Sequence, residues 1–508
     1  MAESRIKNSV NNIGTGIVFR FVSLLMNFFS RTLFIRILGE GCLGLNGLFT
    51  SLLSMFSLAE LGIGQAITFY MYKPIAEKDE VRLASLVNFY KMCYRIIGLA
   101  IFTIGLLLIP LLPKLVNLET DTGYNLYIIY ILYLINTSIT YFFFSYPQTV
   151  LAANQKQNVI NNNNGVFVIV SALMEILSLI ITRNYYIYLI VKITVEVVKN
   201  IFLALKAIKL YPYIIAKNII KINLSEIKVM FKDVYALFVV KLSGQLFNST
   251  DNLFISAMFG TVLSGYNSNY LMIINAIYGV ISTVIYSMSG SIGNLYATET
   301  KEKTERVFAA IDTSNQFVSL VCTICLFQLL NPFISLVWGS RMIFSLFSVA
   351  LMSAAFYIVS SLYGLFAFRQ SMGLFRYCIY NQFAAAVINI ALDYILGKAI
   401  GIEGLFLSTV IANVAIAVFP YARNIYEVGF EMPSRPYIFR IIKGYFLCIL
   451  SGFICWFLCR SFPISYAGLI GMGFVAVITS VLVFLIFNWR TSEMKLVITY
   501  AKNILKIK

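Results

Sequence analysis

Long apolar runs alternate with short polar segments along the whole chain. Within the runs, apolar residues are continuous rather than alternating one by one, which favours helices over the strands of a membrane barrel. A helix needs about 20 apolar residues to cross a bilayer. Runs of that length fall at 11–36, 42–71, 86–112, 124–146, 160–182, 185–207, 234–259, 264–297, 312–337, 342–367, 375–397, 401–423, 438–460 and 463–488. The pattern predicts an all-α polytopic membrane protein with about 14 transmembrane helices.

The start of the chain recurs in its second half. Residues 5–48 match residues 226–269, and the match retains charged, polar and glycine positions. The retained pairs include Arg20 with Lys241, Asn27 with Asn248, Gly39 with Gly260 and Gly44 with Gly265. Six predicted spans separate equivalent positions, so the two halves should share one orientation about an axis along the membrane normal. In a membrane protein, such a repeat is typical of secondary transporters, whose substrate site lies between the two halves.

The repeat predicts four parts. Residues 1–206 should form an N-lobe of six helices, and residues 234–423 a C-lobe of six. Residues 207–233 should be a basic cytoplasmic connector, and residues 424–508 an added helix pair with a basic cytoplasmic tail. The outer loops are too short for a domain, so we expect the function to reside inside the membrane.

Composition agrees with lipid as the solvent. The 508 residues are 59% hydrophobic and 12% charged, with a mean hydropathy of +0.83, which excludes a soluble globule. A net charge of +17 raises the question of nucleic acid, but most cations fall in segments on one side of the predicted membrane. The positive-inside rule then predicts cytoplasmic N- and C-termini, with contacts to anionic lipids. No polar domain exists to bind nucleic acid.

Cations on the polar faces of the first and seventh helices are the candidate substrate-binding groups. These faces carry Arg20, Asn27 and Arg31 in one helix and Lys241, Gln245 and Asn248 in the other. A charge at bilayer depth costs at least roughly 2.5–3.5 kcal/mol, so a cation at equivalent places in both repeats predicts a water-filled chamber between the lobes. Arg31 lies near the helix end, where reaching to the outer surface is an equally good interpretation. Arg95 in the third span is a further candidate for binding an anion.

Acidic residues inside the spans are candidates for ion coupling. Glu175 and Asp393 have no cation within a turn of their own helices, although a cation on another helix could equally pair with them. Asp251 lies beside the polar face of the seventh helix. By contrast, Glu196 should be neutralised by Lys192 and Lys199 on the same helix. The chain contains no histidine, so proton coupling would have to use carboxylates.

The sequence lacks the residues that most membrane enzymes need. Without histidine there is no Ser-His or Cys-His catalysis, and neither a Walker-type loop nor a dinucleotide fingerprint occurs. The eight cysteines lie in or beside apolar runs, where packing is the better interpretation. We therefore expect no catalytic residue, no metal site and no cofactor other than a proton or sodium gradient.

Two segments carry a family resemblance. Residues 36–44, RILGEGCLG, followed by residues 59–66, AELGIGQA, resemble the first helical hairpin of bacterial polysaccharide repeat-unit flippases of the Wzx type. These belong to the multidrug/oligosaccharidyl-lipid/polysaccharide exporter (MOP) superfamily. The resemblance implies two six-helix lobes, an extra helix pair and a plasma-membrane flippase that turns an undecaprenyl-pyrophosphate-linked oligosaccharide to the outer leaflet by alternating access. It also implies glycosyltransferases and a polymerase of the same pathway as partners.

The resemblance also suggests a role for Glu60, which stands where relatives often carry an acid and is thus a coupling candidate. A pyrophosphate head needs cations in a polar cavity, which Arg20, Arg31 and Lys241 could supply. Lipid II and multidrug exporters of the same superfamily remain alternatives, although a repeated basic position argues against organic cations as substrates. A membrane polysaccharide polymerase, the alternative of another class, would be expected to have a large outer loop.

Overall fold

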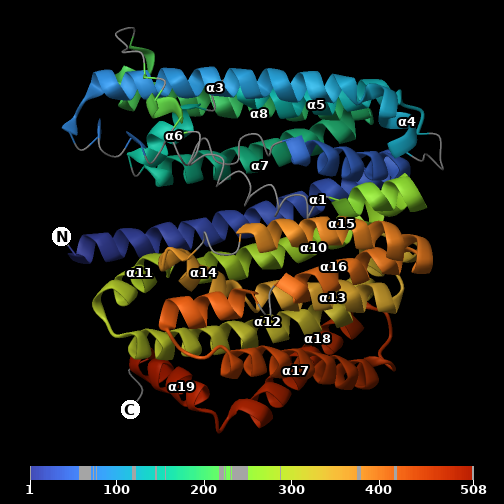
Figure 1. Cartoon of the computed structure of the whole chain (residues 1–508). Helices are drawn as coiled ribbons and strands as arrows, with labels where there is room; N and C mark the ends of the chain where they lie inside the picture. The colour runs from blue at the N-terminus through green and yellow to red at the C-terminus, as the bar shows by residue number, and fades with distance from the viewer. Residues whose placement is uncertain are drawn as a thin grey trace. The chain divides into compact units, whose positions relative to one another are not determined.

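The structure is a computed structural model, and throughout its described part the chain is helical without any strand (Figure 1). The described residues are 2–56, 70–71, 74–75, 77–116, 122–142, 146–154, 156–216, 222–223, 225–228, 230, 250–286, 288–374, 379–416 and 420–505. Among them, nine helices are long and apolar enough to cross a membrane, and the bent pair α5 and α6 would make a tenth. The predicted all-α polytopic fold is confirmed. The predicted spans 42–71 and 234–259 fall partly outside the described residues, so the count of about 14 stays a prediction.

Contacts along the chain define two compact units, Met1–Gly265 and Tyr266–Lys508. This division follows contacts, whereas the predicted domain boundaries follow the sequence repeat, and so it does not test them. In the first unit, α1 packs against α5 and α7, α7 against α8, and α3 against α5. Its helices are α1 (Ala2–Phe56), α3 (Glu80–Leu107), α4 (Leu112–Leu115), α5 (Leu126–Phe142), α6 (Tyr146–Ala153), α7 (Gln157–Thr182) and α8 (Tyr185–Leu210).

In the second unit, α12 is the central helix and packs against α13, α14, α17, α18 and α19. Helix α10 (Thr261–Tyr286) begins at the end of the first unit and continues into the second. The helices that follow are α11 (Ser289–Thr298), α12 (Lys301–Val337), α13 (Leu346–Ser360), α14 (Tyr363–Ser371), α15 (Ile379–Ile400), α16 (Ile402–Ile416), the π-helix η7 (Asn424–Phe430), α17 (Arg435–Cys459), α18 (Tyr466–Asn488) and α19 (Ser492–Leu505).

Large apolar side chains cover the outside of these helices. Ile181, Ile449 and Ile486 are 77%, 73% and 75% exposed, which in water would oppose folding but in lipid costs nothing. The helices end where the sequence requires it. Between α7 and α8, Arg183 adopts a left-handed φ of 49°, and the Asn184 side chain accepts hydrogen bonds from the first backbone N–H groups of α8. This cap explains why two apolar runs with so short a connection form separate helices.

Two pairs of glycines that are equivalent in the sequence repeat also play equivalent structural roles. Gly39 interrupts α1 with a φ of 83°, and Gly260 has a φ of 100° just before α10. Gly44 and Gly265 allow a close backbone crossing of the helices that follow. A Cβ on Gly265 would lie 2.7 Å from Gly44 N, and one on Gly44 would lie 2.7 Å from the Thr261 carbonyl carbon. Only glycine fits there.

Candidate functional site

The predicted cation-lined chamber is only partly within the described residues. Arg20 belongs to helix α1, whereas Lys241, Gln245 and Asn248 lie outside the described part of the chain, as does Glu60. On α1, Asn27 is exposed and Arg31 is half-buried. These assignments as substrate or coupling residues therefore stay predictions.

Arg31 lies in a cluster of tyrosines. Its charge interacts with Tyr133 of α5 and with Tyr185 and Tyr188 of α8, and the Tyr133 and Tyr185 hydroxyls share a hydrogen bond of 3.1 Å. On the next turn of α1, Phe34 packs edge-on against Tyr185 and Tyr188. Arg31 is thus placed near the tyrosines of α5 and α8, whose rings can attract a guanidinium.

Glu175 joins the same cluster from α7. Its Oε1 accepts a hydrogen bond of 2.7 Å from Ser171, and its Oε2 accepts one of 3.0 Å from the Tyr188 hydroxyl and a longer one of 3.5 Å from Ser30. Tyr188 interacts with Glu175 and with Arg31. The structure therefore brings together two residues that the sequence analysis treated separately, an acid on α7 and a base on α1.

The other cations of the first unit considered above are Lys199, Lys192 and Arg95. Lys199 forms an ion pair with Glu196 at 2.5 Å, which confirms half of the predicted network, whereas Lys192 lies 6.0 Å from the centre of the Tyr133 ring. Lys192 therefore borders the tyrosine cluster, because the aromatic face attracts its ammonium. Arg95 on α3 has an exposed side chain and is not among the described residues that meet at Arg31.

Asp393 forms a second polar site between α15 and α16. The carboxylate is fully buried and accepts hydrogen bonds from the Ser408 hydroxyl and, at 3.4 Å, from the Asn389 side-chain amide. Asp393 Oδ2 and Asn389 Oδ1 are buried without a hydrogen-bond partner among the described residues. The Leu405 carbonyl lies alongside, with its oxygen 2.8 Å from the Ser408 hydroxyl oxygen, and accepts a hydrogen bond of 3.2 Å from Thr409.

This concentration of oxygens suits a small hard cation or a proton. Within the described residues, no group of three or more histidine, cysteine, aspartate or glutamate side chains could hold a metal ion. A single carboxylate with amide, hydroxyl and carbonyl oxygens is better matched to a monovalent ion. Two glycines allow α15 and α16 to pack closely around the site. Gly401 has a φ of 77° at the turn between them, and Gly404 lets their backbones touch.

Asp251 lies in the helical segment 250–259, where it is half-buried, next to Asn252. The Asn252 amide donates a hydrogen bond of 2.8 Å to the Ser51 hydroxyl of α1. This hydrogen bond connects the segment 250–259 to α1, so Asn252 has a structural role. The role of Asp251 in ion coupling stays a prediction.

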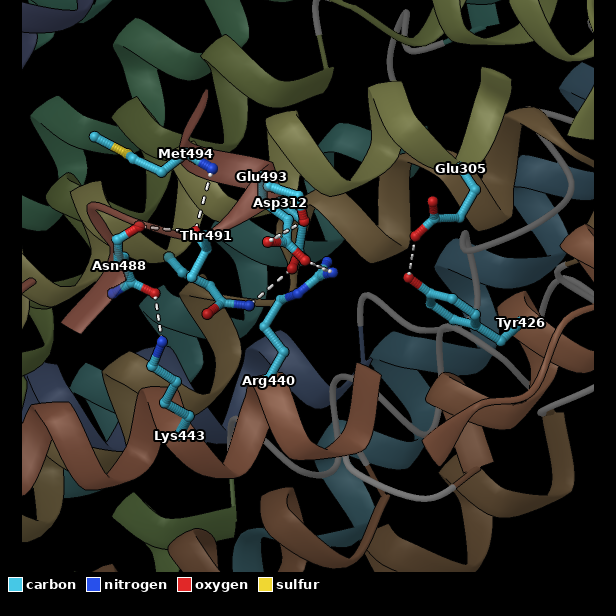
Figure 2. A network of polar contacts seen from close by, with 11 residues as sticks. Glu305, Asp312, Tyr426, Arg440, Lys443, Asn488, Thr491, Glu493 and Met494 are labelled. Carbon is cyan, nitrogen blue, oxygen red and sulfur yellow. Dashed lines mark hydrogen bonds and ion pairs between the residues drawn. The ribbon is translucent and has the colours of Figure 1, made fainter. Parts of the chain in front are cut away.

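Two features were missed by the sequence analysis. The first is Asp312, a fully buried carboxylate of α12 in a network with α17 and α19 (Figure 2). It was overlooked because it stands at the first position of the predicted span 312–337, although Gln316 one turn later was a signal of a polar face. The second is an apolar groove of about 360 Å³ between α17 and α18, lined by residues such as Ile454, Leu458 and Leu482.

Comparison with known proteins identifies the fold but not the substrate. No family model and no curated protein matches the sequence. Among solved structures, a lipid II flippase MurJ in an inward closed conformation is 14% identical with a TM-score of 0.70, over 93% of this chain and 98% of that one. An inward-facing multidrug resistance MATE family transporter of the MOP superfamily is 15% identical with a TM-score of 0.61, over 84% of this chain and 99% of that one.

A MOP superfamily transporter from Pyrococcus furiosus is also similar, with 13% identity and a TM-score of 0.50 over 82% of this chain and 95% of that one. The chain therefore has the fold of MOP superfamily transporters, as the resemblance implied. These similar structures are of transporters and not of enzymes. At such low identity the likeness shows the fold alone, and the polysaccharide subfamily stays a prediction.

Proposed function

We propose that this chain is a flippase that moves an undecaprenyl-pyrophosphate-linked oligosaccharide repeat unit, of the capsule or O-antigen type, from the cytoplasmic to the outer leaflet. It would work by alternating access in the bacterial cytoplasmic membrane, with both termini cytoplasmic. Glycosyltransferases and a polymerase of the same pathway would supply and consume the substrate. No reaction on the substrate is needed, since its covalent bonds are unchanged by transport.

The observation that carries the proposal is Arg31, a half-buried arginine of α1 that lies near tyrosines of α5 and α8. An arginine kept at membrane depth is costly and marks a functional site by default, and its planar fork matches the oxygens of a diphosphate. The aromatic rings nearby can stack on sugar faces, and their hydroxyls can bond to sugar hydroxyls. The apolar groove between α17 and α18 has room for part of a polyprenyl chain.

The experiment that tests this is transport into proteoliposomes with a labelled polyprenyl-diphosphate oligosaccharide. Arg31→Ala should abolish most transport, while Arg31→Lys should keep part of it because the charge remains but the bidentate geometry is lost. Arg36→Ala is the matched control, because Arg36 is an exposed arginine on the same helix. Normal transport by Arg31→Ala would refute the binding role of the arginine.

Ion coupling at Asp393 is the second part of the proposal. Asp393 Oδ2 and Asn389 Oδ1, both buried and without a hydrogen-bond partner in the described part of the chain, are suited to take up sodium or a proton as the substrate crosses. If sodium binds there, it should raise the Tm of the purified protein, since a ligand that binds only the folded state stabilises it. Asp393→Asn should remove that increase. A Tm that responds identically in both proteins would exclude Asp393 as the coupling site.

Lipid II is the second candidate substrate, and the observation that favours it is the TM-score of 0.70 with a lipid II flippase over 93% of the chain. Both substrates present a polyprenyl diphosphate, so Arg31 does not distinguish them. Competition in the proteoliposome assay does. Unlabelled lipid II should compete poorly with the oligosaccharide lipid if the repeat-unit proposal holds, and strongly if lipid II is the substrate.

A further inference from the structure

Asp312 belongs to neither of the sites above and lies in the second unit, on α12. Its side chain is fully buried. Oδ1 accepts a hydrogen bond of 3.1 Å from the Tyr437 hydroxyl of α17, and Oδ2 accepts one of 2.7 Å from the Gln316 side-chain amide. Both carboxylate oxygens thus accept hydrogen bonds from neutral groups. Neither group offsets the negative charge, so other parts of the structure must stabilise it.

One balancing element is the break between α13 and α14. This break is a two-residue turn within one candidate span, Leu346–Ser371. The carbonyls of Ser360 and Ser361 at the turn each accept a hydrogen bond of 2.8 Å from the side-chain amide of Asn315, one turn of α12 away from Asp312. On the other side of the break, a Cβ on Gly364 would lie 3.6 Å from Asp312 Oδ1. The carboxylate therefore lies close to the first turn of α14, and the N-terminus of a helix favours a negative charge.

The other balancing element is Arg440 of α17. Its Nη2 forms an ion pair of 2.6 Å with Glu493 of α19, while its Nη1 is buried without a hydrogen-bond partner among the described residues. The positive charge of Arg440 also acts on Asp312. Figure 2 shows the Arg440 side chain close to both Asp312 and Glu493, so one cation is near an acid of α12 and an acid of α19.

The remaining charged and titratable groups near Asp312 make hydrogen bonds or ring contacts with other residues. Glu305 of α12 accepts a hydrogen bond of 2.8 Å from the Tyr426 hydroxyl of η7, and the Tyr426 ring stacks on Tyr437 at 5.0 Å. On α17, Lys443 donates to the Phe487 carbonyl and the Asn488 side chain at the end of α18. Tyr357 of α13 also interacts with Asp312. No second cation is bonded to Asp312 among these neighbours.

We propose that Asp312 is a proton-binding site whose protonation loosens the break between α13 and α14. Protonation removes the negative charge that the α14 N-terminus and Arg440 stabilise, and it replaces charge-assisted hydrogen bonds by neutral ones of about half the strength. Arg440 is then left with Glu493 as its single acidic partner. The break in the membrane helix and the attachment of α19 thus respond to the same proton, independently of which substrate the protein carries.

Infrared difference spectra of the purified protein in nanodiscs test the proton site directly. Acidification from about pH 8 to about pH 5, a range that buried carboxyl groups reach, should produce the carbonyl band of a protonated carboxyl group. Asp312→Asn should remove the part of this band that belongs to Asp312, measured in an Asp393→Asn background so that the other buried carboxylate does not contribute. Glu302→Gln, which changes an exposed acid of the same helix, should keep it. A band that persists unchanged in Asp312→Asn would overturn the proposal.

Hydrogen exchange of residues 360–366 tests the consequence for the break. In the wild type, acidification should speed exchange there about tenfold beyond the intrinsic pH effect, equivalent to ~1.4 kcal/mol of local opening. Asp312→Asn should exchange fast at both pH values, and Glu302→Gln should behave as the wild type. Equal protection at both pH values in the wild type would refute the link to the break.

If Asp312→Asn does not fold, Tyr437→Phe keeps the carboxyl group and removes one hydrogen bond to its charged form. The midpoint of the infrared band should then move to higher pH, because that bond favours ionisation. An unmoved midpoint would overturn the assignment of the band to Asp312. None of these measurements involves transport, so their failure is distinct from failure of the flippase proposal.

Discussion

Gly404 controls how closely α16 approaches α15, and replacing it tests the geometry of the Asp393 site. A Cβ at Gly404 would lie 2.8 Å from the backbone N of Gly397, and still nearer to the Leu396 carbonyl. Ordinary contacts between such atoms are ~3.5–4.0 Å, so Gly404→Ala must move the helices apart by at least roughly 0.7 Å. Backbone atoms cannot rotate away as a side chain would.

The separation should reach Ser408, one helical turn after Gly404, whose hydroxyl is bonded to Asp393. Overpacking costs about 1–3 kcal/mol, and a lost hydrogen bond to a charged group costs ~1.5–3 kcal/mol. We therefore expect Gly404→Ala to lower the free energy of unfolding by about 2.5–6 kcal/mol. The sodium- or proton-dependent part of the stability should decrease as well, because the oxygens no longer converge.

Thermal unfolding of the purified protein in detergent, with sodium and with potassium, measures both effects. Gly452→Ala in α17 is the matched control, since a Cβ there would lie 3.7 Å from Ile324 Cδ1, an ordinary contact. The control should keep the wild-type Tm within about one degree, because surface-like additions change stability by roughly 0.5 kcal/mol or less. A Gly404→Ala protein with the wild-type Tm and the wild-type response to sodium would refute the reasoning.

Three further predictions concern charged groups. Arg20→Ala or Lys241→Ala should stop most transport without reducing insertion, as export assays with membrane-level controls would show; normal export by both variants would contradict a role for the repeated cation. Glu175→Gln should alter the dependence of transport on the proton or sodium gradient, and an unchanged dependence in proteoliposomes would exclude it as a coupling residue. Burial raises the pKa of Glu493, but backbone hydrogen bonding and the charge of Arg440 outweigh this and leave the pKa below its ordinary value. Its ion pair with Arg440 should therefore stabilise α19 fully above about pH 4.3 and be lost as the pH falls through the lowered pKa. Protease sensitivity of α19 should rise only in that acidic range. In Glu493→Gln the sensitivity should not change with pH.

The hydropathy pattern predicted the fold because lipid permits few solutions. A continuous apolar run in a membrane must satisfy its backbone internally, so run lengths translate directly into helices, as the separate α7 and α8 confirm. The prediction that residues 342–367 form one span is confirmed, since α13 and α14 together make one candidate span, Leu346–Ser371, but the two-residue turn between them was not predicted. The reason lies in a tertiary contact, because Asn315 of another helix bonds the carbonyls freed at Ser360 and Ser361.

In the candidate sites too, contacts within one helix follow from the sequence, whereas contacts between helices do not. Spacing along a helix shows which residues share a face, and Asn389 with Asp393, like Ser171 with Glu175, are four residues apart and bonded in the structure. Partners on other helices carry no such signal in one sequence. The contact of Tyr188 with Glu175 therefore required the fold.

Gly44 and Gly265 occupy corresponding places in the two copies of the repeat and touch each other. In a symmetric dimer, a residue on the twofold axis meets its own counterpart, so one codon change alters both sides of the contact at once. A gene duplication relaxes that constraint, because each copy can then mutate alone. Glycine is nevertheless present on both sides of this contact, where the close backbone crossing leaves no room for a side chain in either copy.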